Sequence, residues 1–336
     1  SFGLTANAAL SLGDATATGA LSAEGALQAD GGYLIGGSFA DFSWENEPVG
    51  TWPFAVELGD QVLVATLGAN GEAYLRLTGQ GDIQARLDPV LPLSFDASGR
   101  VSGDTISLDL RSVALSMPAL FRFLGEPFIQ ASSGVARGSL AIHGPVSDPD
   151  IEGRLDMDNV YLVLPELIPE PIGPLLEPLY FTGRTMETDQ PTVLAGGATL
   201  RASLYSTIRS WTPDDMTITA ATTGTDLVPV SSKLLGLGIE GMANADVTIR
   251  VQKEDVDIQG TVRVAKGDIS ITTGVFAGGD GEEESYGLSL ALDLGFGASV
   301  RVYFPDRNLP LIYGQTDPSS KLAVSFDGSS GDFSLK

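Results

Sequence analysis

Two pairs of carboxylates are spaced by two residues, and this spacing puts both members of a pair on the same face of a β-strand. The first pair is Asp156 and Asp158, and the second pair is Asp255 and Asp257. Carboxylates placed in this way could act as the pair of a glycoside hydrolase. Such pairs also arise readily when 43 acidic residues share the polar faces of strands. We therefore do not expect an enzyme, and a carbohydrate-active β protein that uses Asp156 and Asp158 is the catalytic alternative.

Metal and cofactor chemistry has little support in the sequence. His143 is the one histidine, so no second histidine can complete a metal site or a proton relay. The acidic run at 280–284 lacks the spacing of a recognised calcium loop. No cysteine is present, which excludes disulfides, thiolate zinc sites and cysteine nucleophiles. We predict no catalytic residue, no metal site and no cofactor.

The charge of the chain limits its partners. Its 43 acidic residues outnumber 19 basic ones, which gives a formal net charge of -24 at pH 7. Binding to nucleic acid requires clustered Lys and Arg, so nucleic acid is an unsuitable partner. In a chain rich in strands, repulsion between copies also suppresses pairing of exposed edges.

Apolar and polar residues alternate with a period of two from one end of the sequence to the other, which predicts β-strands with one buried face. The clearest run extends from Tyr286 to Phe304, where nearly every second residue is apolar. Gly295 and Gly297 predict a bend, bulge or turn within that run. Clusters such as 68–71 are typical of hairpin turns. The fold class predicted is all-β.

Three short stretches interrupt this pattern. Residues 116–125 contain a capping serine, an early proline and a closing glycine, and they predict a short helix. Residues 229–236 resemble them more weakly and suggest a second short helix. The proline-rich apolar stretch at 164–176 is interpreted as a connector within the domain.

An internal repeat is visible at an offset of 107 residues. Ile151, Gly153 and Leu155 align with Ile258, Gly260 and Val262, and the neighbouring apolar positions keep the same spacing. Repetition of this kind is typical of a sheet that grows by adding similar segments. We therefore expect one continuous repetitive β domain over residues 1–336, with repeat units around 130–236 and 237–336. Because both ends read as strands, we interpret the sequence as a segment of a longer chain.

The stretches 138–144 and 147–157 resemble the recurring motif of the TamB family, within the AsmA-like superfamily. They comprise a strand, a small loop with Pro149 and a second strand with Gly153, followed by an apolar turn at 160–165. Residues 180–183, 196–200 and 302–311 continue the likeness. The resemblance covers about two thirds of the chain, and it depends on the order of the pieces because no single motif is specific.

This resemblance implies a fold, a location and partners. The fold would be an elongated, curled antiparallel or mixed sheet, a taco-like trough with an apolar interior and a few short helices. Such proteins lie in the periplasm, are anchored to the inner membrane, and serve lipid transfer or outer-membrane protein assembly. The implied partners are lipid acyl chains or unfolded outer-membrane protein strands, together with an outer-membrane assembly barrel.

The residues expected to line an apolar groove are the inward-facing members of the alternating runs. A secreted or surface β-sandwich that acts as an adhesin or binding protein is the alternative, because it would show the same alternation. The predicted lining comprises Leu140, Ile142, Ile151, Leu155, Met157, Leu200, Leu204, Ile258, Val262, Val264, Ile269, Ile271, Leu288, Leu290, Leu292, Leu294 and Phe296.

Overall fold

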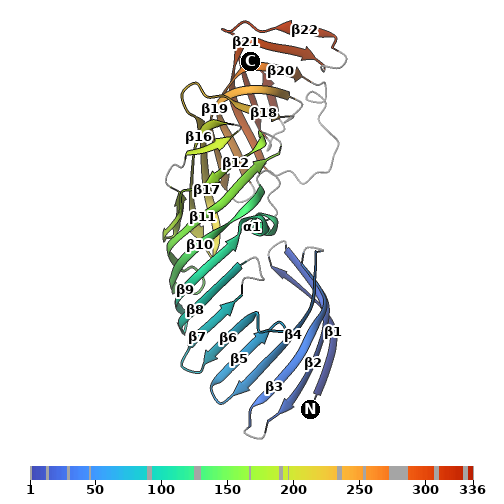
Figure 1. The fold of residues 1–336 in the computed structure, drawn as a ribbon, viewed down its shortest axis with the longest axis vertical. Helices are drawn as coiled ribbons and strands as arrows, with labels where there is room; N and C mark the ends of the chain where they lie inside the picture. The colour runs from blue at the N-terminus through green and yellow to red at the C-terminus, as the bar shows by residue number, and fades with distance from the viewer. Residues whose placement is uncertain are drawn as a thin grey trace. The chain divides into compact units, whose positions relative to one another are not determined.

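The computed structural model is almost entirely β-sheet (Figure 1). Strands take up 81% of the residues and helix 2%, so the predicted all-β class is confirmed. One neighbouring pair of strands is parallel, which makes the sheet mixed. The structure describes residues 2–12, 15–28, 31–44, 47–88, 93–124, 130–165, 168–188, 192–195, 197–232, 237–252, 255–271, 287–305, 310–327 and 332–335.

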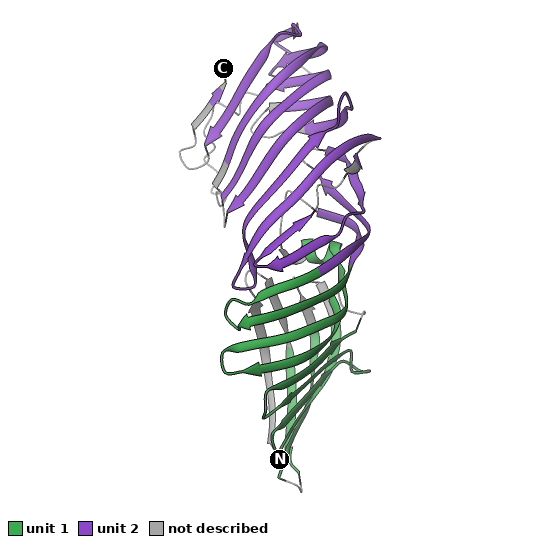
Figure 2. Cartoon of the chain, turned by 90° about the vertical axis from the view of Figure 1, so that its left-hand side faces the viewer, with its two compact units in different colours: residues 1–123, 137–153 green, residues 124–136, 154–336 purple. Residues whose placement is uncertain are grey.

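Two compact units make up the chain (Figure 2). The first comprises residues 1–123 and 137–153, and the second comprises residues 124–136 and 154–336. In each unit the strands form a curved sheet. The single continuous domain expected from the sequence stays a prediction.

In unit 1, nine successive strands pair antiparallel, each with the next one along the chain. Antiparallel strands need only short turns between them, in agreement with the Gly- and Asp-containing hairpin signals of the sequence. The strands are β1 (Phe2–Leu12), β2 (Ala15–Leu27), β3 (Tyr33–Trp44), β4 (Glu47–Gly59), β5 (Val62–Leu67), β6 (Ala73–Thr78), β7 (Asp82–Leu87), β8 (Leu93–Ser102) and β9 (Thr105–Ser116).

Residues of β10 (Gln130–Pro145) and β11 (Asp150–Leu164) belong to both units. The remaining strands belong to unit 2, where pairing departs from chain order: β17, for example, pairs with β19. These strands are β12 (Ile168–Leu175), β13 (Leu179–Gly183), β14 (Thr185–Thr188), β15 (Thr192–Ala195), β16 (Ala198–Arg209), β17 (Thr212–Thr222), β18 (Val228–Ser232), β19 (Leu237–Gln252), β20 (Asp255–Ile271), β21 (Gly287–Phe304), β22 (Ile312–Gln315), β23 (Lys321–Asp327) and β24 (Asp332–Leu335).

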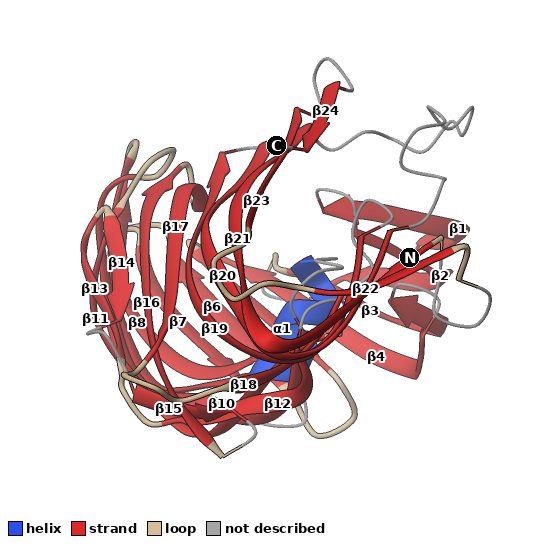
Figure 3. Cartoon of the chain, turned by 90° about the horizontal axis from the view of Figure 1, so that it is seen from above, coloured by secondary structure: helices blue, strands red, loops and turns tan. Residues whose placement is uncertain are grey.

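The helix predicted at 116–125 is confirmed as α1 (Met117–Leu124), drawn in blue in Figure 3. The second predicted helix is wrong for the residues that are described, because Val228–Ser232 form β18 and residues 233–236 lie outside the description. Val228 and Val230 alternate with Pro229, and Val228 is almost fully buried, so burial of a strand face overrides the weak helix signal. Among the described residues, no helix is long and apolar enough to span a membrane.

The proline-rich stretch predicted as a connector is largely a strand. Strand β12 pairs with β11 through Ile168, Ile172 and Leu175, and the register shifts between these contacts. Proline lacks the N–H that a regular ladder requires, so a proline-rich strand pairs only intermittently.

A bulge interrupts β20 and β21 at the same level of the sheet. Val264 pairs with Phe296 and Lys266 pairs with Ser299, so Ala265 faces both Gly297 and Ala298. A Cβ at Gly297 would lie 2.2 Å from the carbonyl oxygen of Ala265, so this approach requires glycine. The predicted irregularity is thus confirmed at Gly297, whereas Gly295 pairs regularly with Arg263.

The hairpins β10–β11 and β19–β20 agree at the offset of 107 residues. Strand β10 starts at Gln130 and β19 starts at Leu237. Gly153 and Gly260, which the offset aligns, both have positive φ, at 140° and 156°. A Cβ at either glycine would lie 2.2–2.3 Å from a backbone oxygen of the preceding strand. The repeat seen in the sequence therefore corresponds to a repeated backbone conformation.

Candidate functional site

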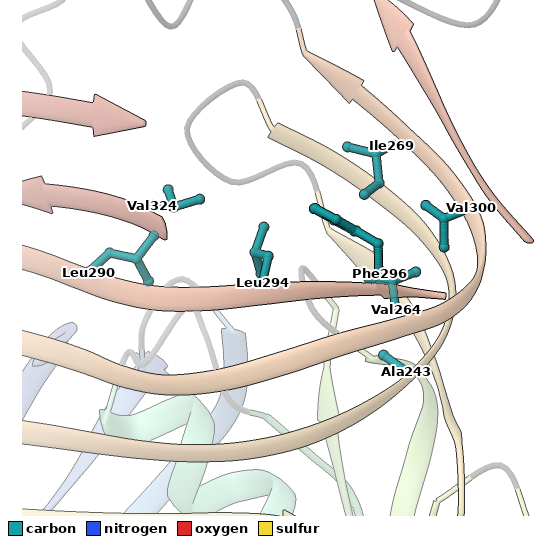
Figure 4. Packing of buried hydrophobic residues seen from close by; sticks show 8 residues of the cluster. All are labelled: Ala243, Val264, Ile269, Leu290, Leu294, Phe296, Val300 and Val324. Atoms are coloured by element: carbon teal, nitrogen blue, oxygen red, sulfur yellow. The ribbon is translucent and has the colours of Figure 1, made fainter. Parts of the chain in front are cut away.

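Most of the predicted lining residues of β20 and β21 lie in one buried cluster (Figure 4). Their side chains project from the concave side of the curved strands. The cluster contains Val264, Ile269, Leu290, Leu294 and Phe296, each with 6% or less of its surface exposed. Ile258, Val262 and Leu292 are partly buried against it. This part of the predicted lining is therefore packed against other residues of the chain.

The other predicted lining residues lie elsewhere. Ile142 and Leu155 are buried on β10 and β11, whereas Leu140, Ile151 and Met157 are half-buried on the same two strands. Leu200 belongs to a second cluster with Ile172, Ala198 and Val228, and Leu204 is half-buried further along β16. Ile271 lies in β20 and Leu288 lies in β21, but the structure describes only the backbone of these two residues.

Unit 1 contains an apolar surface that the predicted lining did not include. Residues directly opposite each other in neighbouring strands share a face of the sheet. One such row passes from β3 to β9 and holds no polar side chain: Ile35, Val56, Ala65, Leu75, Ala85, Ala97 and Leu110. The row on one side of it also passes through all seven strands, and the row on the other side passes from β3 to β8.

We call this surface the apolar face. Phe39 and Phe54 confirm that neighbouring rows are in contact, since their ring centroids are 5.2 Å apart. No Asp, Glu, Lys or Arg belongs to the face. It consists of alternate residues in the ranges Tyr33–Phe39, Trp52–Leu58, Leu63–Leu67, Ala73–Leu77, Ile83–Leu87, Phe95–Val101 and Ile106–Leu110.

The apolar face is partly open to solvent. Ala97 is its one buried member, and nearly all the others are half-buried. Leu75, near the middle of the sheet, is 38% exposed. In the cluster of β20 and β21, by contrast, Val264 and Val300 are fully buried. Large contiguous apolar surfaces that remain accessible mark binding sites in soluble proteins.

The opposite face of the same strands carries the charged side chains, together with some apolar ones such as Leu34 and Val64. Glu57, Arg76 and Gln84 lie in one of its rows, and Arg86 and Asp96 pair in the next. Ion pairs hold some of these side chains, as between Arg100 and Asp82 at 2.7 Å. One face of the sheet is thus suited to water and the other to an apolar ligand.

The carboxylates considered for catalysis have structural partners. Asp156 forms an ion pair with Arg154, and Asp158 accepts a hydrogen bond from the side chain of Asn159. His143 lies 3.7 Å from Glu152 at the surface. No group of three or more potential metal ligands occurs among the described residues.

The short strands of unit 1 explain why the sequence analysis missed the apolar face. Strands β5, β6 and β7 have six residues each, so each contributes only three alternating apolar positions. The sequence feature that could have predicted the apolar face is the succession of short alternating runs separated by turns such as Asn70-Gly71 and Gln80-Gly81. Comparison with known proteins adds no assignment: no family model matches the sequence, and no curated protein and no solved structure matches the chain.

Proposed function

We propose that this chain is a TamB-like β-sheet segment that shields lipid acyl chains from water on its apolar face. The observation that supports this proposal is the set of adjoining apolar rows on β3–β9, largely half-buried on one face of the sheet while the charged side chains lie on the other face. Seven strands at about 4.8 Å spacing make this surface roughly 29 Å wide, which leaves room for acyl chains that lie along the strands.

The energetics favour such a role. An acyl chain of about 16 carbons costs about 13 kcal/mol to expose to water, at roughly 0.8 kcal/mol per methylene. An apolar surface removes part of that cost without any hydrogen bond. An unfolded protein strand would bring backbone N–H and C=O groups that the apolar side chains cannot satisfy. Acyl chains are therefore the occupant that this surface suits best.

The location and partners follow from the resemblance and belong to the same proposal. A TamB-like segment would act in the periplasm as part of a chain anchored to the inner membrane. It would pass lipid towards the outer membrane, next to a barrel that assembles outer-membrane proteins.

The test compares two leucines of similar exposure on opposite faces of the same sheet. Leu75 is 38% exposed on the apolar face, and Leu34 is 41% exposed on the opposite face, where it pairs with Glu57. We expect Leu75→Gln to weaken acyl-chain binding roughly 5- to 150-fold, because an unpaired amide against an apolar ligand costs about 1–3 kcal/mol. Leu34→Gln should bind like the unmodified chain.

The measurement is native mass spectrometry of protein purified from a bacterial host, with extraction and identification of co-purifying lipid. A lipid-free chain that also ignores added short-chain phosphatidylcholine would disprove the proposal. Equal loss of binding in both variants would mean that the apolar face is not the site. Thermal unfolding of each variant checks that the fold survives.

A further inference from the structure

The turns that border the apolar face carry acidic residues and no basic ones among the residues described. At one edge, Asp60 lies in the turn between β4 and β5, and Asp104 lies in the turn between β8 and β9. At the other edge, Glu72 precedes β6 and Asp88 follows β7. The Lys and Arg side chains of this region occur within the strands, on the opposite face.

The charged form of one of these carboxylates, that of Glu72, is stabilised by a hydrogen bond. The backbone N–H of Asn70 donates a hydrogen bond of 2.9 Å to Glu72 and lowers the pKa of that carboxyl group. Asp60 and Asp104 are exposed, and no ion pair between described residues includes either of them. Asp88 is the exception, because it lies 3.2 Å from Arg86.

This arrangement bears on the headgroup of a bound lipid. An acyl chain on the uncharged face leaves its headgroup at one of the two edges, beside these turns. A carboxylate attracts an ammonium group and repels a phosphate that has no compensating cation. A second copy of the chain is a poor occupant of the same surface, because both copies carry a net charge of -24.

We propose that the apolar face selects lipids whose headgroup carries an amine or quaternary ammonium and disfavours lipids with a net negative headgroup. This inference rests on the proposed function, since it names the lipid class for the same surface. The selecting groups are Asp60 and Asp104 at one edge and Glu72 at the other.

The probes are dioctanoylphosphatidylcholine and dioctanoylphosphatidylglycerol, which have identical acyl chains, titrated below their micelle-forming concentrations in low salt. We expect the zwitterionic lipid to bind about three- to tenfold more tightly, the range that one or two exposed charge contacts supply. The ratio of the two dissociation constants should approach one in high salt, because exposed charges are then screened.

Two double variants separate the edge from the overall charge. Asp60→Asn with Asp104→Asn, and Asp96→Asn with Asp109→Asn on the opposite face, both change the net charge from -24 to -22. We expect only the edge variant to narrow the difference between the two affinities, and part of the difference to remain because Glu72 is unchanged at the other edge. If both variants do so equally, if neither does, or if the anionic lipid binds as tightly to the unmodified chain, the inference is wrong. Absence of binding by both lipids would instead disprove the proposed function.

Discussion

The carboxylate of Asp268 is the most enclosed charge that the structure describes in an ion pair. Its side chain is 11% exposed and lies 2.7 Å from the Nε atom of Arg301, which also donates a hydrogen bond of 3.0 Å from Nη2. A buried carboxylate that loses its cation keeps the cost of its desolvation. The exposed pair of Arg154 and Asp156 stays in water with or without its partner.

We therefore expect Arg301→Ala to lower the midpoint of urea unfolding several times more than Arg154→Ala does. The measurement is denaturation of both variants followed by circular dichroism at pH 7. Equal midpoints would show that water reaches Asp268 freely once the arginine is removed. Asp268→Asn combined with Arg301→Ala should recover part of the loss, because the unpaired charge is then absent.

At the residue scale, the sequence analysis identified the inward face of β20 and β21 but not its burial. Alternation tells which side chains share a face, as it does for Leu290 and Leu294. It does not tell how deeply that face is buried, because the packing partners lie in other strands, for example Ala243 and Val324. This limit put fully buried Val264 into the predicted lining, whereas the shortness of β6 kept Leu75, which is 38% exposed, out of it.

At the scale of elements, the paired hairpins offer a direct test of the repeat. Gly153→Ala and Gly260→Ala each add a Cβ within 2.2–2.3 Å of a backbone oxygen, at positive φ. We expect each to destabilise the protein by about 1–4 kcal/mol, since backbone must move to relieve the contact.

Gly295→Ala is the matched control, because its nearest contact would be an Arg263 side-chain atom at 3.5 Å. It should change stability by no more than about 1 kcal/mol. Chemical denaturation of the three variants gives the comparison. Similar losses in all three would mean that the close approach at Gly153 and Gly260 carries no special cost.

Element types were predictable where local signals agreed with packing. Ser116, Pro118 and Gly125 indicate a helix, and α1 forms there. Val228–Ser232 and Ile168–Leu175 became strands because each has a neighbouring strand to pair with, which no local signal reveals. The order of strands in unit 2 could not be predicted from the sequence either, because β17 pairs with β19 and not with β18, the next strand along the chain.

At the scale of the whole molecule, the charge of -24 has a consequence for solubility. Lowering the pH towards the isoelectric point of about 4.1 protonates carboxylates and removes the repulsion between copies. We expect the chain to be monodisperse at pH 7 and to associate near pH 4.1, as measured by sedimentation velocity at constant ionic strength. Monomers at both values would show that net charge does not control association.

The matching hairpins also bear on how such a chain changes in evolution. Unequal recombination between the segments that encode β10–β11 and β19–β20 would delete or duplicate 107 residues. The constrained glycines lie against equivalent residues of the preceding strand, Gly153 against Leu140 and Gly260 against Val247. Leu140 and Val247 are also 107 residues apart, so a joined product would keep the alternation of faces at that level. Length could then vary in whole modules while the chemistry of each surface is inherited unchanged.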